Sequence, residues 1–315
     1  MNQSKQLTDG ALLTAIYIVL LLVTVFVPVV SILTTFLLPI PFIIFAFKHD
    51  WKPSLLMLAV AAVLTMLFAT VFSFPLVVLV GLGGLMIGSA MHQNLSAYET
   101  WARGTFGFIV GLLFVFVFTQ FMLQINLIEE FQKMIDQSLE MTTGIFERFG
   151  AAEQTDEALE MMQTTMGGLT ELIPVGLAMA AIMLAFISQW ISYKVINRIE
   201  SKQLYFPPFR TLQFPIAIVW VYFFALIFSF IEFDANSIFN MGAQNILVLT
   251  GLLMTIQGFS FIFFYAHHKK MSKAIPIVIV ILTLLFPLLL IYLVRIVGII
   301  DLGFGLRERL TKKKE

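Results

Sequence analysis

The chain has 315 residues, of which 59% are hydrophobic and 12% are charged, and its 19 lysines and arginines balance its 19 aspartates and glutamates. This composition excludes an ordinary water-soluble enzyme and an intrinsically disordered chain, both of which carry far more charge. The zero net charge gives no support to nucleic-acid binding, and the absence of cysteine excludes disulfides and thiolate metal sites. We therefore expect an all-α, polytopic membrane protein, because helices satisfy their own backbone hydrogen bonds in lipid.

Long stretches without charge open the chain. Residues 10–47 and residues 53–91 contain no Asp, Glu, Lys or Arg. Each stretch is about twice the roughly 20 residues that a helix needs to cross the hydrocarbon core. We therefore predict a helix pair in each, with turns near Pro28 and Pro75. A fifth span is expected at Gly104–Gln124.

The insert after the fifth span, residues 126–170, differs from the spans in composition. Between Glu129 and Glu171 the sequence carries ten acidic and two basic residues. Two stripes there have the period of an amphipathic helix, namely Ile128, Phe131, Ile135, Leu139, Thr142, Phe146 and Phe149, then Leu159, Met162, Met166 and Leu169. We expect two short helices outside the hydrocarbon core, with Thr155 as the N-cap of the second. The insert is either a structural cap over the spans or a binding lid for an external ligand or partner, and the sequence does not choose between these two roles.

Residues 171–297 carry the remaining spans, and residues 298–315 form a charged tail. The candidate spans are Leu172–Tyr193, Thr211–Ile231, Asn245–Ala266 and Ala274–Val294. The last is too short for two full spans, so a bend at Pro287 or a re-entrant segment is the alternative to a complete crossing. The sequence thus predicts a bundle of eight or nine spans, divided into a first half (1–125), the acidic insert and a second half.

Lys and Arg indicate the orientation, because they are enriched in cytoplasmic loops. With a cytoplasmic N-terminus, two of them before the tail, Lys133 and Arg148, lie outside. The inside set is larger and comprises Lys5, Lys48, Lys52, Arg103, Lys194, Arg198, Lys202, Arg210, Lys269, Lys270 and Lys273. We therefore expect the N-terminus in the cytoplasm. After nine spans the basic tail would lie outside, against this pattern. The sequence therefore does not determine on which side of the membrane the tail lies.

Polar side chains within the spans are candidates for a solute pocket or for hydrogen bonds between helices, since desolvating them is costly. They are Gln120, Gln124, Gln189, Asn245 and Gln257. No acidic or basic residue lies at the centre of a clear span, which disfavours ion-coupled transport. No nucleophile–base set, phosphate-binding loop or metal-ligand spacing occurs either. We predict no catalytic residue, no metal, no cofactor and no enzymatic activity.

Small residues at a spacing of four indicate close contacts between membrane helices. Three such pairs stand out: Gly84 and Gly88, Gly107 and Gly111, and Ala11 and Ala15. They predict helix packing and carry no information about a substrate.

The C-terminal end reads Gly298-Ile-Ile-Asp301-Leu-Gly-Phe304-Gly-Leu-Arg307. With the chain length and hydropathy, it resembles the YybS-like family of bacterial membrane proteins of unknown function, which implies a location in the bacterial cell membrane. Asp301 and Arg307 are off-phase on a helix, so they pair only if the segment turns. Pairing with a loop charge such as Glu200, and anchoring of the last helix at the interface, are the alternatives.

The first half is also similar to the S components of energy-coupling-factor transporters. The similarity rests on Ala11 and Ala15, the Leu38-Pro39-Ile40-Pro41 step, the basic Lys48–Lys52 loop and the glycine-rich fourth span. S components are short proteins of about six membrane helices. The resemblance implies that the chain binds a small solute and works with a transmembrane module and paired ATPases, which Ala11 and Ala15 would contact. The alternative is a non-catalytic scaffold or accessory protein of the cell envelope.

Overall fold

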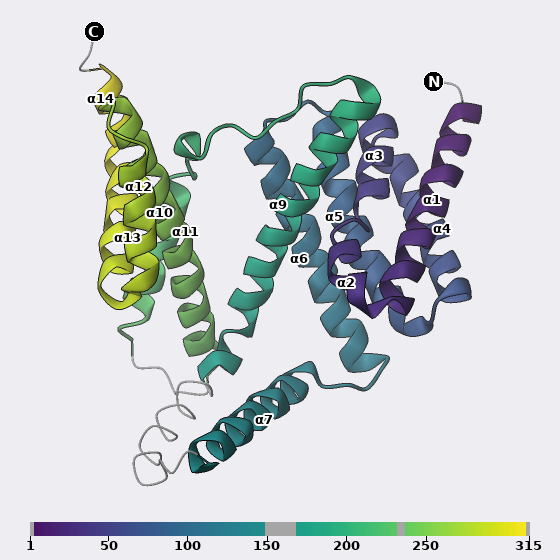
Figure 1. Cartoon of the computed structure of the whole chain (residues 1–315), viewed down its shortest axis with the longest axis horizontal. Helices are drawn as coiled ribbons and strands as arrows, with labels where there is room; N and C mark the ends of the chain where they lie inside the picture. The colour runs from purple at the N-terminus through teal and green to yellow at the C-terminus, as the bar shows by residue number, and fades with distance from the viewer. Residues whose placement is uncertain (1–2, 149–167, 232–236, 313–315) are drawn as a thin grey trace. The chain divides into compact units, whose positions relative to one another are not determined.

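The computed structural model describes residues 3–148, 168–231 and 237–312, and every regular element in these ranges is a helix (Figure 1). Eight of these helices are long and apolar enough to cross a membrane. The prediction of an all-α bundle of membrane helices is therefore confirmed. The chain forms two compact units, residues 1–206 (unit 1) and residues 207–315 (unit 2).

Unit 1 contains six of the eight long spans and the described part of the insert. Its helices are α1 (Gln3–Phe26), α2 (Pro28–Thr35), α3 (Ile40–His49), α4 (Trp51–Phe68), η1 (Val71–Ser73), α5 (Phe74–His92), α6 (Ala97–Phe121), α7 (Leu127–Arg148) and α9 (Ile173–Glu200). Helices α2 and α3 together make one span, Pro28–His49. The turns predicted near Pro28 and Pro75 coincide with the starts of α2 and α5.

Close contacts between backbones hold α5 against its neighbours. A Cβ added at Gly84 would lie 2.8 Å from Pro39 O next to α3, and one added at Gly107 would lie 2.8 Å from Leu82 O on α5. Gly88 and Gly111 approach α3 and α5 in the same way. Because only glycine leaves room for such an approach, the two glycine pairs occupy helix crossings.

Helix α9 returns to α6 after the insert, which explains why unit 1 extends beyond residue 125. Trp101 Nε1 of α6 donates to Ile182 O of α9 over 2.9 Å. Gln189 Nε2 of α9 donates to Ala97 O over 2.9 Å. The division of the chain into halves at the insert therefore differs from the compact units, since the sixth span belongs with the first five.

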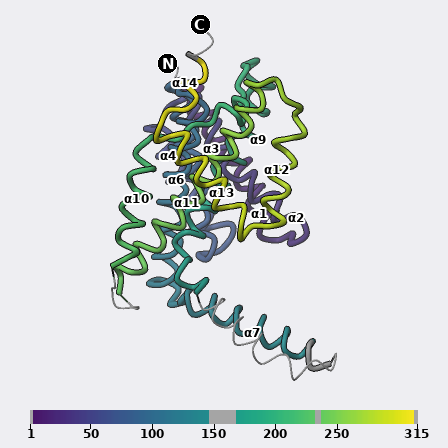
Figure 2. The backbone as a smooth tube through the Cα atoms, turned by 90° about the vertical axis from the view of Figure 1, so that its left-hand side faces the viewer, coloured from purple at the N-terminus to yellow at the C-terminus, as the bar shows by residue number. Residues whose placement is uncertain are grey.

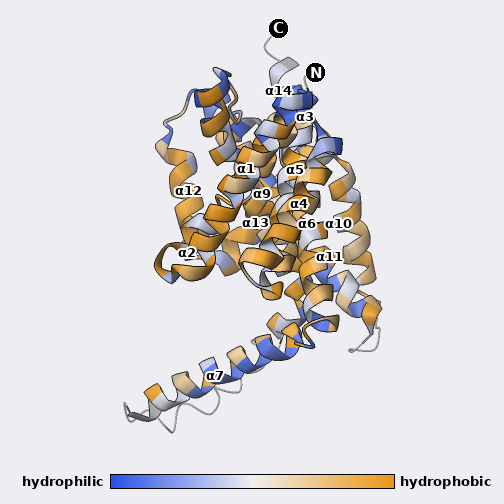
Figure 3. Cartoon of the chain, turned by 90° about the vertical axis from the view of Figure 1, so that its right-hand side faces the viewer, coloured by the Kyte–Doolittle hydropathy of each residue, from blue (hydrophilic) through white to orange (hydrophobic). Residues whose placement is uncertain are grey.

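The insert begins as the sequence predicts. Helix α7 alternates hydrophilic and hydrophobic residues, unlike the apolar spans (Figure 3). Phe149 of the first stripe, most of the second stripe and the expected N-cap Thr155 lie outside the described residues. Leu169 is in a helical turn before α9. In α7, the Glu130 carboxylate accepts a hydrogen bond from Lys133 and raises the pKa of this exposed ammonium group.

Unit 2 consists of η3 (Phe209–Thr211), α10 (Ala217–Phe228), α11 (Ile238–His268), α12 (Ala274–Leu285), α13 (Pro287–Phe304) and α14 (Leu306–Lys312). Two expected spans need correction here. Helix α10 covers only the middle of Thr211–Ile231, because Pro215 precedes its first residue and the chain turns at Ser229 and Phe230. The stretch Ala274–Val294 is not one span, because the chain breaks at Phe286 and Pro287, and only α13 is long enough to cross.

The break at Pro287 reverses the chain, so α12 and α13 form a hairpin (Figure 2). Proline lacks the N–H that would continue the helical ladder. Helix α12 has 12 residues, or about 18 Å of helix. The hairpin carries the tail back to the end of unit 2 where α11 ends and α12 begins, since Arg307 Nη1 donates to Arg210 O over 2.9 Å.

Candidate functional site

A buried polar cluster links three helices of unit 2. Its members are Asp301 of α13, Arg307 of α14, and Gln257 and Ser260 of α11. Arg307 Nε donates to Asp301 Oδ2 over 2.9 Å, and Gln257 Nε2 donates to the same oxygen over 2.6 Å. The side chain of Asp301 is 0% exposed and that of Arg307 is 10% exposed. Each charge has therefore exchanged most of its water for protein partners.

The turn at Gly305 allows the ion pair to form. Six residues place Asp301 and Arg307 on different faces of a continuous helix. However, α13 ends just before Gly305, which has a φ of +59°, a left-handed conformation that glycine adopts without a steric cost. The turn brings Arg307 back against α13. Glu200, the alternative partner considered from the sequence, pairs instead with Lys48 over 2.7 Å in unit 1.

The cluster also holds the segment before α10, in which only the short turn η3 is helical. Its bonds to this segment join Ser260 Oγ to Phe209 O (2.9 Å) and Leu212 O (2.7 Å), Phe214 N to Gln257 Oε1 (3.0 Å), and Arg307 Nη1 to Arg210 O (2.9 Å). These side chains therefore satisfy backbone groups that have no regular ladder of their own.

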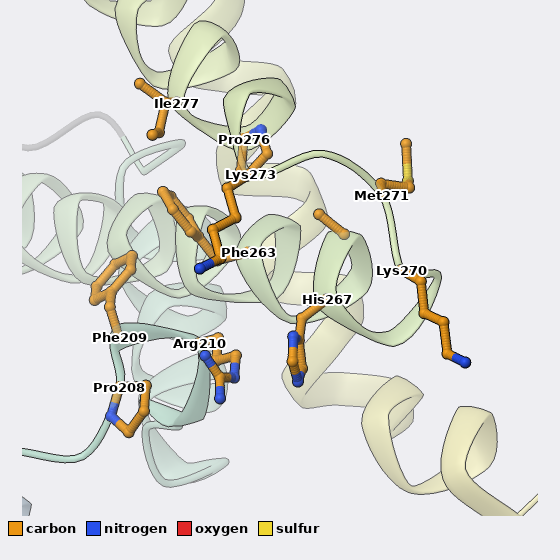
Figure 4. Close-up of a pocket in the computed structure, with 11 residues that line it drawn as sticks. Pro208, Phe209, Arg210, Phe263, His267, Lys270, Met271, Lys273, Pro276 and Ile277 are labelled. Atoms are coloured by element: carbon orange, nitrogen blue, oxygen red, sulfur yellow. The ribbon is translucent and has the colours of Figure 1, made fainter.

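An open pocket of about 540 Å³ lies beside this segment (Figure 4). It is bounded by η3, by the last turns of α11 and by the start of α12. Apolar side chains, among them Phe209, Phe263 and Ile277, form part of its wall. The wall also contains four basic side chains, Arg210, His267, Lys270 and Lys273.

No carboxylate neutralises these basic groups within the described ranges of the chain. None lines the pocket, and no ion pair there involves Arg210, Lys270 or Lys273. Figure 4 shows the Lys273 ammonium beside Phe263 and Arg210 on the adjoining part of the wall, whereas Lys270 points away. Cations that line one pocket without a counter-charge favour the binding of an anion there. In the part of the chain that the structure describes, no group of three metal-ligating side chains occurs.

The five polar residues predicted within spans have different settings within their own units. Gln257 belongs to the buried cluster, and Gln189 lies in unit 1. Gln120 is half-buried near the end of α6, and Gln124 is exposed beyond that helix. Asn245 is buried on α11 and donates to the backbone of its own helix. None of the five lines the basic pocket.

Gln189 lies among polar groups at the contact of α6 and α9. It is fully buried, and its amide also lies 2.7 Å from Tyr193 Oη. The hydroxyls of Ser188 and Ser192 are buried nearby on α9. This arrangement agrees with amide side chains acting between helices.

Ala11 and Ala15 are exposed on α1 and line a groove of about 610 Å³ between α1 and α4. Gly10 and Thr14 extend the small-residue wall of this groove, and Leu56 and Val60 of α4 form its opposite wall. We call this surface the α1–α4 groove. It lies in unit 1 and is open to the surroundings of the chain.

The C-terminal motif has members in three settings. Gly298 lies at the crossing of α11 and α13, where an added Cβ would overlap Met254 O. Asp301 and Arg307 form the buried ion pair. Phe304 is 58% exposed at the end of α13. The motif therefore shapes both the packing and the polar cluster of unit 2.

Sequence reasoning did not assign Ser260, Arg210 or Lys273 to a common site. Ser260 follows Gln257 by three residues, so the two share a helix face, and this spacing was an available signal. Arg210 and Lys273 are 63 positions apart in loops. No local pattern indicates that these loops meet.

Comparison with known proteins places the chain in a family. The model of the DUF2232 family of predicted membrane proteins matches residues 15–302. The chain belongs to this family. It is also 28% identical over 309 residues to the uncharacterized protein YybS of Bacillus subtilis (strain 168), and the match covers 98% of this chain and 99% of that protein. No solved structure matches.

The family match includes Gly298 and Asp301 and ends before Phe304 and Arg307. The relation to YybS extends over nearly the full length of both chains. Together with the eight long apolar helices, these findings establish an integral, multi-span membrane protein.

Proposed function

We propose that this chain is a small-solute-binding membrane module of the S-component type, which works with a separate transmembrane and ATPase assembly. The observation that carries the proposal is the composition of unit 1. Six of the long membrane helices lie within residues 1–206. This is the span number that the resemblance in the first half implies. Unit 2 and α7 are then additions to the module, and the proposal assigns no catalytic step to this chain.

The α1–α4 groove supports the same proposal. Ala11 and Ala15, the residues that the resemblance assigns to partner contact, are exposed on α1. Small side chains allow the backbone of a partner helix to approach closely, which is a main source of helix association in lipid. In unit 1 these alanines are therefore available to a membrane-embedded partner.

Copurification tests the proposed partner. We expect the tagged chain, extracted from its own bacterium in mild detergent, to retain a transmembrane protein and ATPase subunits. The double variant Ala11→Leu/Ala15→Leu should reduce the retained partner by about tenfold, because two enlarged side chains prevent close approach at a cost of about 1–3 kcal/mol. Quantitative mass spectrometry of the eluate measures the change.

Ala102→Leu is the matched control, because Ala102 is exposed on α6 and receives the same enlargement away from the groove. It should leave the amount of partner unchanged. If neither a partner nor a bound small solute copurifies with the unmodified chain, the transport proposal fails and the scaffold function takes its place. Equal loss in both variants would show that α1 is not the contact.

We also propose that the N-terminus and the tail both lie in the cytoplasm. The hairpin of α12 and α13 brings the tail to the end of unit 2 that carries Arg210 and Lys273. If α10 and α12 cross despite their 12 residues, the basic tail follows the enrichment of Lys and Arg in cytoplasmic loops. The basic tail then no longer lies outside, as it would after nine spans.

Cysteine labelling tests this orientation directly, because the chain has no cysteine of its own. In intact cells, a membrane-impermeant maleimide should label Ser138→Cys on α7 and leave Ser272→Cys and Thr311→Cys unlabelled. The latter two should react only after the cells are opened. Labelling of Thr311→Cys alone from outside would contradict the hairpin topology, and labelling of Ser272→Cys would contradict the orientation.

A further inference from the structure

The basic pocket of unit 2 combines charge from three elements that are far apart in the sequence. Arg210 comes from η3, His267 from the last turn of α11, and Lys273 from the residue before α12. Basic residues scattered over a cytoplasmic loop satisfy the usual orientation bias without meeting one another. Here the three residues line one pocket of about 540 Å³ (Figure 4).

The positive charge of the pocket comes from side chains and not from the start of α12. Ala274 N already donates to Ser272 Oγ over 3.3 Å, and Ile275 N donates to Ser272 O over 3.2 Å. Pro276 has no N–H. An anion in the pocket would therefore be bound by the Arg210 guanidinium, the Lys273 ammonium and the His267 ring. In proteins, phosphate oxygens accept hydrogen bonds from groups of these kinds.

The backbone below the pocket is fixed before any ligand binds. Arg307 and Ser260 hold the carbonyl groups of Arg210 and Phe209. Because these bonds involve backbone atoms, the side chain of Arg210 stays available to the pocket. A site whose frame is already ordered loses less entropy on binding.

We propose that this pocket binds the phosphate group of an anionic phospholipid. The apolar part of the wall supports a lipid over a free ion. Phe263 and Ile277 lie on α11 and α12, helices of membrane-like composition, so the wall continues from the basic loop toward the apolar helices. A phospholipid offers a phosphate to the basic end and an acyl chain to the apolar end. Inorganic phosphate would use only the first.

Native mass spectrometry of the full chain in detergent tests the proposal with phosphatidylglycerol and with phosphatidylcholine of the same acyl chains. We expect phosphatidylglycerol to bind at least tenfold more tightly. The double variant Arg210→Gln/Lys273→Gln should weaken its binding by about 25-fold, or about fivefold for each charge, which corresponds to about 1 kcal/mol for each basic residue. Glutamine at position 210 retains the carbonyl that Arg307 contacts, so folding should be preserved.

Lys269→Gln/Arg309→Gln is the control, because it removes two exposed charges from unit 2 and neither residue lines the pocket. It should change the affinity less than twofold. Equal losses in the two double variants, or no preference for phosphatidylglycerol, would overturn the proposal. Inorganic phosphate is added as a competitor. If millimolar phosphate displaces the lipid completely from the unmodified chain, the site takes the free ion and the assignment to a lipid is wrong.

Discussion

Arg307→Met is expected to destabilise unit 2 by about 3–5 kcal/mol, because it leaves the Asp301 carboxylate buried without its cation. Asp301 is fully buried, and Gln257 also donates to it. The variant also removes the bond from Arg307 Nη1 to Arg210 O, so the segment before α10 loses one of its attachments. Denaturant unfolding in detergent, followed by tryptophan fluorescence, measures the loss.

Arg309→Met is the matched control, because Arg309 is exposed on the same short helix, α14. Its effect should stay within about 0.5 kcal/mol. The double variant Asp301→Leu/Arg307→Met should recover most of the lost stability, since apolar residues often replace a buried ion pair without a net cost. If Arg307→Met and Arg309→Met behave alike, the buried pair does not stabilise the fold.

The sequence predicts the membrane class and most of the spans because hydropathy over about 20 residues is a local property. The prediction of full spans is wrong at α10 and α12, and the reason is also local. Pro215 and Pro287 cut apolar stretches that hydropathy alone reads as continuous. The sequence indicates Pro287 as a candidate bend, but the direction of the chain after it depends on the contacts of α13 with α11.

The candidate site is less accessible to sequence reasoning than the fold. The C-terminal motif contains both Asp301 and Arg307, and the turn that pairs them depends on Gly305 between them. The basic pocket cannot be predicted without knowing that residues 208–210 approach the end of α11. Such contacts between loops are set by tertiary packing and leave no periodic signal. The same holds for unit 1, where the return of α9 to α6 across the insert determines its extent.

The crossing of α11 and α13 is the contact on which unit 2 most depends, and it yields the last prediction. A Cβ at Gly298 would overlap Met254 O and lie 2.8 Å from Gly258 N. A Cβ at Gly258 would in turn overlap Val294 O. All three obstacles are backbone atoms, which cannot rotate away as a side chain would. The helices would have to separate for any larger residue to fit.

Gly298→Ala should therefore destabilise the protein by about 1–3 kcal/mol, the cost typical of overpacking, although alanine is the better helix former by about 1 kcal/mol. Gly303→Ala on the same helix, where nothing lies within 4 Å of the added Cβ, should leave stability unchanged or raise it slightly. The two substitutions are chemically identical, so the difference between their unfolding free energies isolates the crossing. Equal effects would mean that α11 and α13 are farther apart than this packing requires. Asp301 lies one helical turn beyond Gly298, so a wider crossing should also lengthen the hydrogen bond between Asp301 and Gln257. The polar cluster would then already be weakened in Gly298→Ala. In that background Arg307→Met should therefore cost less stability than in the unmodified chain.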